Sequence, residues 1–203
     1  MAPTAPNHNW VDLTFLGGVG EIGLNMMTLE TADHLVVVDA GLMFPEDPML
    51  GIDIVIPDFT YLRERRDKLM ALVLTHGHED HIGAVPFFLK EFAAPIYGTP
   101  LTLALLREKL KEHGLLNDAD LREIRPSEPL SLGPFEFEFV RVCHSIVDGV
   151  GSRFAHDRCQ LRGPDLSAQS GLQDRKKLLA GRAGQSAFGP RLCQLRRDLH
   201  EPG

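Results

Sequence analysis

The chain has 203 residues, of which 43% are hydrophobic and 24% are charged. This composition fits one globular domain with a sizeable core, or one domain and a poorly structured remainder. No apolar run is long enough to cross a bilayer, and the N-terminal MAPTAPNHNW lacks the basic start and hydrophobic centre of a signal peptide. We therefore expect a cytoplasmic protein. Its three cysteines form no CxxC pair and predict neither a disulfide framework nor a zinc knuckle: Cys143, Cys159 and Cys193.

The net charge of -7 is distributed unevenly along the chain. Residues 1–151 contain 11 Lys and Arg against 23 Asp and Glu, whereas residues 152–203 contain 10 against 5. The second segment also has no Val, Ile, Met, Thr, Tyr, Trp or Asn, although the first uses all seven. A β-rich domain needs β-branched and aromatic residues for its strands. We therefore expect an N-terminal extension over residues 1–9, a domain over residues 10–151 and a basic tail over residues 152–203.

Short β-rich runs alternate with helical runs from Trp10 to Gly151, as in an α/β domain. The patterns predict strands over residues 11–16, 26–30, 34–41 and 69–75, and helices over residues 58–68, 84–92 and 100–113. Residues 134–142 alternate phenylalanine with glutamate before continuing apolar, which is typical of a half-buried strand.

A glycine-rich stretch, GGVGEIG from Gly17 to Gly23, contains the spacing GxGxxG. Together with Asp39, roughly 20 residues later, it would suit a dinucleotide-binding turn. Such a turn must open a helix, whereas residues 24–30 predict a strand. We therefore expect a tight strand-to-strand turn near the active site.

The stretch LTHGHEDHIG, Leu74 to Gly83, concentrates three histidines and an aspartate. Alternate residues of an extended segment point to one side, so His76 and His78 can converge on one metal ion. Asp80 and His81, which turn into the following helix, can face a second ion. Imidazole and carboxylate ligands suit zinc or manganese, and room for water makes such a site catalytic. The alternative is a loop of surface histidines.

Two residues elsewhere could join this cluster. Asp39 ends VVVD at the C-terminal edge of a strand, where α/β proteins place reactive groups, although a turn-capping aspartate is the alternative. His144 follows the 134–142 strand and could complete a three-histidine site with an open position, or it could be a core histidine. The remaining histidines stand in polar contexts and receive no role: His8, His34, His113, His156 and His200.

These residues carry a resemblance. HGHEDHIG matches the HxHxDH signature of the metallo-β-lactamase fold, and the chain from about Trp10 to Gly151 resembles the ribonuclease J family. The similar segments are LGGVGEIGLNM, VVVDAGLMFPE, GIDIVIPDFTYL, THGHEDHIGAVPFFL, PIYGTPLTLALL and VCHSI. That family belongs to the β-CASP branch and comprises bacterial RNA exonucleases and endonucleases. The resemblance implies an α/β fold, the αββα sandwich, of which this chain would hold the N-terminal half.

The resemblance also implies a ligand set and a chemistry. His76, His78 and His144 would bind one zinc ion, Asp80 and His81 would bind the other, and Asp39 would orient a ligand. Asp39 and Asp80 are thus the candidate catalytic residues. A complete site would hold two zinc ions, of which we expect one to be held well here, with manganese or magnesium as alternatives. The metals would activate water for attack on phosphorus and stabilise the departing 3′-oxygen.

The family pattern continues beyond the HSI segment with a strand and a T/S-G-D turn whose aspartate bridges the two metals, and later with a further histidine and an inserted domain. We expect none of these features after residue 151. Asp165 has a suitable spacing from His144, but no strand is predicted before it. The composition of residues 152–203 suggests out-of-frame translation; a natural short relative with a basic RNA-binding tail and a deliberate truncation are the alternatives. We expect little or no ribonuclease activity from this chain.

The partner implied by the resemblance is single-stranded RNA, with no membrane, and homo-oligomers are compatible with the full-length family. Two rival functions remain open. The first is a small-substrate hydrolase of the same fold, acting on a thioester or lactone, and the second is a non-catalytic metal-binding or RNA-binding fragment.

Overall fold

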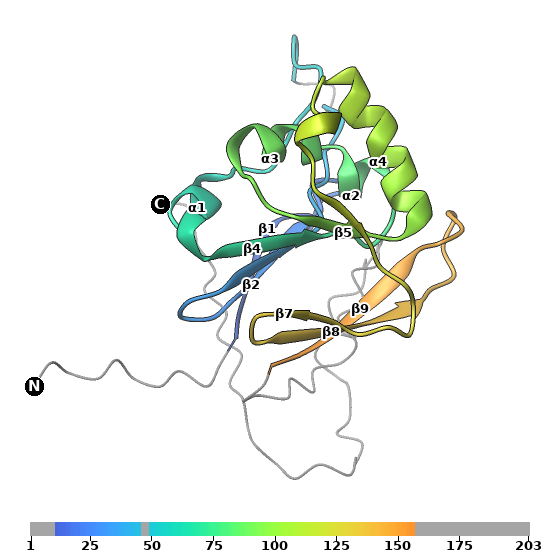
Figure 1. Ribbon diagram of the computed structural model, residues 1–203. Coiled ribbons are helices and arrows are strands. Elements are labelled where there is room, and N and C mark those ends of the chain that lie inside the picture. Colours follow the sequence, from blue (N-terminus) through green and yellow to red (C-terminus); the bar gives the residue numbers. More distant parts are fainter. Residues whose placement is uncertain (1–10, 46–48, 157–203) are drawn as a thin grey trace, which may run out of the picture.

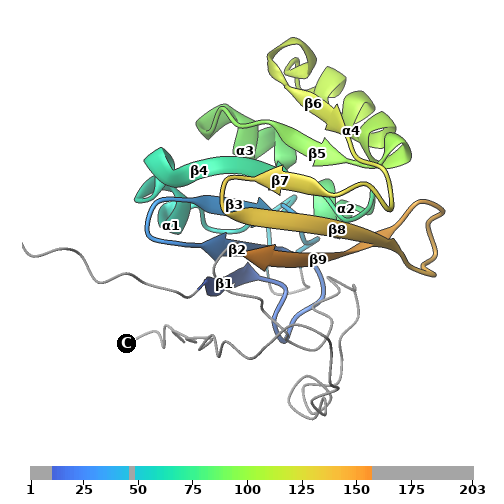
Figure 2. The ribbon, with the colours of Figure 1, turned by 60° about the horizontal axis from the view of Figure 1, so that its bottom comes forward.

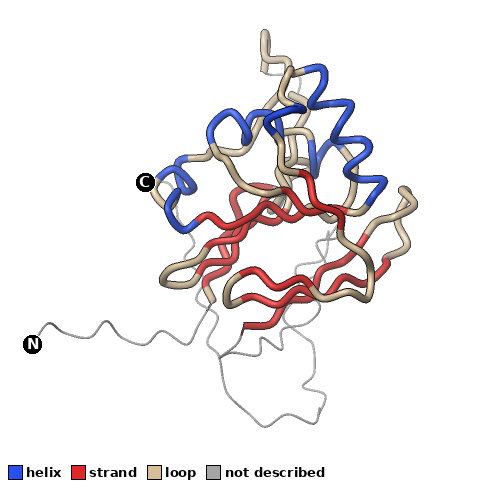
Figure 3. Tube along the Cα trace, in the orientation of Figure 1, coloured by secondary structure: helices blue, strands red, loops and turns tan. Residues whose placement is uncertain are grey.

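The computed structural model describes residues 11–45 and 49–156 of the chain (Figure 1). Two β-sheets lie face to face, and the helices gather on the outer face of the larger sheet, as the tube drawing also shows (Figure 3). The described residues therefore form three successive layers, of helices, sheet and sheet. This confirms the predicted partial metallo-β-lactamase-type sandwich, without the second helical layer within the described ranges.

The larger sheet has six strands in chain order: β1 (Asp12–Gly17), β2 (Met26–Glu30), β3 (Leu35–Val38), β4 (Leu69–Val73), β5 (Ile96–Gly98) and β6 (Leu121–Glu123). The pairs β1–β2 and β2–β3 are antiparallel, and the pairs from β3 to β6 are parallel. Every residue of β3 is buried because both faces of the sheet are covered. The strands predicted over residues 11–16, 26–30 and 69–75 are confirmed with small shifts at their ends. The strand predicted over residues 34–41 is confirmed but ends at Val38, because Asp39 has a φ of 61° and leaves the extended conformation.

The smaller sheet contains β7 (Leu130–Leu132), β8 (Phe135–Arg141) and β9 (Val150–His156), all antiparallel. Figure 2 shows it lying across the larger sheet. Phe135, Phe137 and Phe139 are buried between the sheets, and the glutamates between them are exposed. The alternation of residues 134–142 thus produces the half-buried strand that it predicts.

Strand β9 corrects one expectation. The strand that follows the HSI segment in the family pattern was expected to be missing, yet Val150–His156 pairs with β8 along its whole length, from Val150 opposite Arg141 to His156 opposite Phe135. Val150, Ser152 and Phe154 are buried at alternate positions of this strand, and Val150 and Phe154 belong to the core between the sheets. Residues 157–203, including Asp165, lie outside the described residues.

The helices are α1 (Thr60–Arg63), α2 (Glu79–Ile82), α3 (Val85–Glu91) and α4 (Pro100–Glu112), with 3-10 turns at Arg66–Lys68 and Leu116–Asp118. The helix predicted over residues 58–68 is shorter than expected, because Arg65 leaves the helical conformation with φ -121° and ψ 19°. The helices predicted over residues 84–92 and 100–113 are confirmed, the latter opening on Pro100. No described helix combines the length and the apolar character that crossing a membrane requires.

Two hydrophobic cores hold the three layers together. One lies between the larger sheet and the helices and includes Leu35, Leu72, Phe88 and Leu106. The other lies between the sheets and includes the three β8 phenylalanines. Side chains pack against both faces of β3 and β4. The loops that follow these two strands are therefore anchored to well-packed strand ends.

The glycine-rich stretch forms the connection between the antiparallel strands β1 and β2, which confirms the strand-to-strand turn. No described helix follows it before Thr60, so the dinucleotide interpretation of GxGxxG is excluded. The connection ends at Asn25, whose amide contacts Asp80, so the turn lies beside the histidine cluster.

Candidate metal centre

The loop after β4 brings His76 and His78 together. Residues 74–78 follow the strand in an extended course, and α2 begins at Glu79 directly after His78, which has φ -75° and ψ 152°. Nε2 of His76 lies 3.1 Å from Nδ1 of His78, and the ring centroids are 4.7 Å apart. The two imidazoles therefore present one nitrogen each to the same point.

His144 reaches this point from the loop between β8 and β9. Its ring centroid lies 4.6 Å from that of His76 and 4.8 Å from that of His78. One ligand nitrogen from each of the three histidines lies within 4.8 Å of the others, so the group could hold a metal ion. The backbone supports this loop, because the amide of Val150 donates to the carbonyl of Thr75, next to His76.

Asp80 and His81 form a second pair beside these three. Nε2 of His81 lies 3.4 Å from Oδ2 of Asp80, and the His81 ring centroid lies 4.0 Å from that of His76. Nε2 of His81 is buried without a hydrogen-bond partner among the described residues. A buried polar nitrogen that lacks a partner is costly, and a metal ion is one group that would satisfy it.

Asp39 holds the other side of the His81 ring. Its Oδ2 accepts a hydrogen bond from Nδ1 of His81 at 2.8 Å, and its Oδ1 accepts one from the Thr75 backbone amide at 2.8 Å. The Thr75 hydroxyl also bonds to Oδ2 at 2.8 Å. Asp39 itself is buried and has the uncommon φ of 61°, which turns the chain sharply at the end of β3. This arrangement directs Nε2 of His81 toward Asp80.

Burial and neighbouring charges set different pKa values in the cluster. Burial is the main cause that lowers the pKa of His76 to about 4, and the imidazolium forms of its neighbours lower it further. Burial would also lower the pKa of His81, but Asp39 and Asp80 outweigh it and raise this pKa to about 9. The His81 imidazole, whose Nε2 lies 3.4 Å from the Asp80 carboxylate, lowers the pKa of Asp80. At neutral pH His76 therefore offers a lone pair, whereas His81 carries a proton that a cation would have to displace.

Gly41 allows the histidine loop to approach β3 closely. A Cβ at this position would lie 1.6 Å from the carbonyl oxygen of Asp80. The Ala40 amide donates a hydrogen bond to the carbonyl of His81 in the histidine loop, and the Gly41 amide donates one to the carbonyl of Asn25 at the end of the β1–β2 connection. The Asn25 side chain donates to both the carbonyl and the carboxylate of Asp80, at 3.0 Å each.

The structure thus gathers all six residues that the sequence singles out around one point. The supporting partners Thr75, Asn25 and Gly41 were not predicted. Only proximity to the motif could have suggested Thr75, which precedes His76, and nothing in the sequence links Asn25 with Asp80. Within the described residues the three-histidine group is the one set of three or more potential metal ligands that lie together. His34 bonds to Thr31 and His113 packs on Phe87, away from the cluster.

Comparison with known proteins shows which protein superfamily the chain is similar to. A model of the metallo-beta-lactamase superfamily matches residues 20–154, a range that contains the whole cluster. Among solved structures, the metallo-beta-lactamase fold protein YhfI from Bacillus subtilis aligns with a TM-score of 0.50 and 22% identity, over 71% of this chain and 57% of that chain. A protein of unknown function from Enterococcus faecalis gives 0.53 and 18%, over 70% and 40%. At these identities the likeness concerns the fold alone.

The sequence relatives are ribonucleases. The chain is 51% identical over 144 residues to ribonuclease J2 of Bacillus subtilis, which is 71% of this chain and 26% of that protein. It is 48% identical over 139 residues to ribonuclease J of Helicobacter pylori, which is 68% of this chain and 20% of that protein. The predicted resemblance to ribonuclease J is confirmed, and the chain spans about a quarter or less of the length of the curated relatives it matches.

Proposed function

Because the chain belongs to the metallo-beta-lactamase superfamily, we propose that it carries part of a ribonuclease J-type active site, one that hydrolyses RNA phosphodiester bonds with the help of bound metal ions. The observation that carries this proposal is the meeting of His76, His78 and His144 at one point, in a chain about half identical to ribonucleases J over some 70% of its length.

The contacts support the proposed ligand set. His76, His78 and His144 would hold one ion, and Asp80 with His81 would contribute to a second. Nitrogen ligands favour zinc over magnesium, and mixed nitrogen and oxygen ligands are compatible with manganese. Bound metal ions would lower the pKa of water and polarise the scissile phosphate, which the protein groups alone cannot do at neutral pH.

Residues around the metal ligands orient the ligand side chains and determine which of their nitrogens carry protons. Asp39 keeps a proton on Nδ1 of His81, so that Nε2 has its lone pair available once the second proton leaves. Asn25 fixes the carboxylate of Asp80 beside that nitrogen. Burial keeps His76 neutral, so that it needs no deprotonation before it binds a cation.

The substrate proposal follows from similarity to relatives named for ribonuclease activity. Among the described residues only Asp80 and His81 are placed for a second ion, and loss of one metal ligand commonly removes several powers of ten in rate. We therefore expect cleavage of single-stranded RNA to be much slower than that of a longer relative assayed in parallel.

The test combines metal analysis with single-turnover assays. The chain and its His76→Ala variant are incubated with zinc or manganese and a 5′-monophosphorylated single-stranded RNA, and in parallel with a thioester and a lactone. We expect slow cleavage of RNA alone, dependent on metal and lost in the variant. Turnover of the thioester or lactone with intact RNA would instead support a small-substrate hydrolase, and failure to bind any metal would contradict the proposal as a whole.

A further inference from the structure

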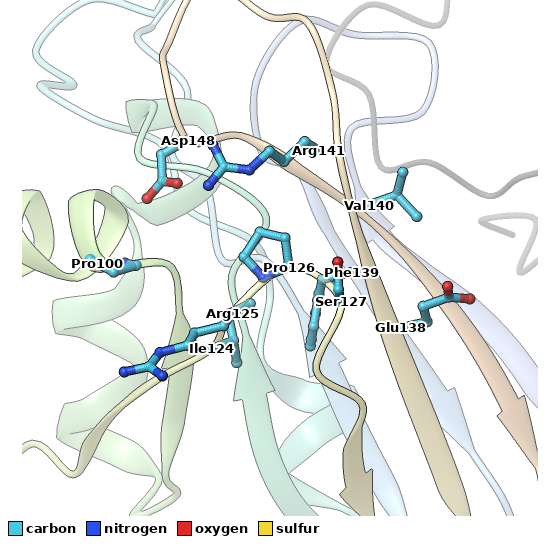
Figure 4. A pocket seen from close by; sticks show the side chains of 10 residues that line it. All are labelled: Pro100, Ile124, Arg125, Pro126, Ser127, Glu138, Phe139, Val140, Arg141 and Asp148. Carbon is cyan, nitrogen blue, oxygen red and sulfur yellow. The ribbon is translucent and has the colours of Figure 1, made fainter.

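A second feature lies beside the histidine cluster, an open pocket of about 650 Å³ between β8, the end of β6 and the start of α4. Figure 4 shows the side chains around it: Pro100, Ile124, Arg125, Pro126, Ser127, Glu138, Phe139, Val140, Arg141 and Asp148. Its volume falls in the range of roughly 300 to 1,000 Å³ that ligand pockets occupy. Its lining combines apolar surface with two guanidinium groups, as a site for an apolar body with a negative group requires.

The two acidic side chains of the pocket are engaged with other groups. Oδ2 of Asp148 accepts a hydrogen bond from the backbone amide of Leu101, at the start of α4. Glu138 forms a salt bridge with Arg153 at 3.4 Å. Asp148 is therefore tied to the start of α4, and the charge of Glu138 is offset by Arg153, in a pair whose side chains are both more than half exposed. The two arginines are the positively charged groups of the lining.

The arginines come from two separate elements. Arg141 is exposed at the end of β8, and no described residue forms a salt bridge with it. Arg125 follows β6 and lies 3.8 Å from Glu128, but both of these side chains are more than two-thirds exposed. An ion pair so exposed contributes little, so the Arg125 guanidinium can turn to an anionic ligand at small cost.

The pocket is continuous with the metal centre through the loop between β8 and β9. Asp148 lines the pocket, and a Cβ on the next residue, Gly149, would lie 3.7 Å from the Cβ atoms of both His76 and His144. On the opposite side, the Leu105 side chain of α4 packs near Gly77, between His76 and His78. A chain-like ligand that leaves the metal centre in this direction would therefore meet the pocket next.

Both loops that border the pocket contain a residue in an unfavourable backbone conformation. Ser127 has φ 76° and Asp148 has φ 116°, and neither is a glycine. Such conformations cost about 1 to 3 kcal/mol each and tend to occur where function requires a particular loop shape. The presence of two such residues at one pocket supports a binding site with a defined loop conformation.

We propose that this pocket holds a nucleotide of the RNA strand next to the bond that is cleaved. Arg141 and Arg125 contact its phosphate, and the apolar wall of Pro100, Pro126 and Val140 packs against its sugar and base. The inference rests on the proposed function, because it takes its ligand from there. Guanidinium groups suit phosphate through paired N–H donors, and contact with an apolar wall binds a base without selecting its identity.

The test measures binding alone, without catalysis. Fluorescence anisotropy of a labelled ten-nucleotide oligouridylate is recorded with the full chain in the presence of EDTA, over a range of salt concentrations. Arg141→Ala should weaken binding roughly fivefold to tenfold at low salt, and each lost phosphate contact should reduce the slope of log affinity against log salt by about 0.7. Arg125→Ala/Arg141→Ala should reduce the slope about twice as much.

Matched variants separate a site from a general loss of charge. Lys90→Ala and Lys90→Ala/Lys111→Ala remove one and two exposed positive charges outside the pocket and should leave the slope nearly unchanged. Arg141→Lys should keep most of the slope but lose affinity, because it keeps the charge and loses the paired donors. Equal losses in the lysine variants, or no loss in the arginine variants, would overturn the proposal.

Two further arms identify the ligand and keep this proposal separate from that of the metal centre. Inorganic phosphate should compete with the RNA only weakly; if it displaces RNA at comparable concentrations, the pocket is a simple anion site and the nucleotide assignment is wrong. Because the assay contains EDTA, oligonucleotide binding is measured without metal ions and tests the pocket independently of the metal centre. Unchanged binding in Arg141→Ala would refute the pocket even if the parent chain cleaves RNA. Failure of the parent chain to bind any metal would refute the proposed function even if the pocket binds RNA.

Discussion

Oδ2 of Asp39 lies 2.8 Å from Nδ1 of His81, and both side chains are almost completely buried. The same carboxylate accepts hydrogen bonds from the backbone and the hydroxyl of Thr75. Asp39 therefore links the end of β3 to the loop after β4, and it determines which nitrogen of His81 carries a proton. A residue in this position acts on a metal ion through the ligand that it orients.

Asp39→Asn tests this role with almost no change in size. The fixed amide of Thr75 requires an oxygen opposite it, so the new amide group must face His81 and donate to Nδ1. Nε2 then carries the remaining proton and cannot bind a cation. We expect the affinity for a second zinc ion, the one beside Asp80 and His81, to fall about 10-fold to 100-fold, measured by competition with a chromophoric chelator. Asp58→Asn, at an exposed aspartate, is the control, and equal zinc affinity in both variants would contradict the role.

Metal stoichiometry should separate the two ligand groups. We expect close to one tightly held zinc ion per chain, because among the described residues three histidines converge on one point while only Asp80 and His81 serve a second. Elemental analysis after desalting should find this ion lost in His76→Ala, His78→Ala and His144→Ala, and largely retained in Asp80→Ala. Two tightly held ions in the parent chain would show that a residue outside the described ranges completes the second group.

Most of the fold could be predicted because its long elements follow simple patterns. The alternation of phenylalanine and glutamate in β8 and the apolar run of β3 each indicate one kind of strand. Strands β5, β6 and β7 have three residues each, too few to show any period, and they exist because their neighbours pair with them. Strand β9 was missed because its glycine, serine and arginine have low strand preference, which pairing with β8 overrides.

The site could be predicted where its residues are close in sequence. The spacing of HxHxDH places four candidate ligands within six residues, whereas the position of His144 after a strand left a core histidine open as the alternative. Contacts between distant segments have no local signal. The contact of Asn25 with Asp80 spans 55 positions, and the pocket unites Arg125 with Arg141 only through the pairing of strands.

Gly41→Ala should disrupt the metal centre without altering any ligand. Its Cβ would overlap the Asp80 carbonyl at 1.6 Å, so the loop that carries Asp80 must move away. We expect a loss of about 2 to 4 kcal/mol in the free energy of unfolding and a clear loss of zinc affinity. Gly51→Ala is the control, because its Cβ would meet no atom within 4 Å and its cost comes from the φ of 80° alone. Similar zinc affinity in the two variants would contradict this explanation.

The coding sequence offers a test of the proposal that the frame changes near Ser152. If it does, one of the other two frames of the DNA downstream of this codon should encode a T/S-G-D turn at the position the family pattern requires. Recovery of that turn would explain the change in composition at this point. Its absence from both frames would reject the proposal and leave a natural basic extension as the better account.

Glu30 provides a prediction about stability and pH away from the metal centre. Its carboxylate accepts hydrogen bonds from Tyr61 at 2.5 Å, Lys68 at 2.6 Å and Arg65 at 2.9 Å. Burial alone would raise the pKa of Glu30, but the hydrogen bonds from Lys68 and Tyr61 and the two positive charges outweigh it and lower the pKa. The folded protein therefore favours the ionised form more than the unfolded chain does.

The sign of the pH effect follows from this lowered pKa. The contribution of Glu30 should be fully present above the ordinary glutamate pKa of 4.5 and should disappear as the pH falls through the lower value of the folded state. Glu30→Gln should lose about 1 to 3 kcal/mol in the free energy of unfolding at pH 7. Urea unfolding of both proteins at several pH values should show this difference shrinking below pH 4.5. A difference that stays constant or grows toward acid would mean that the ionised carboxylate does not stabilise this end of β2.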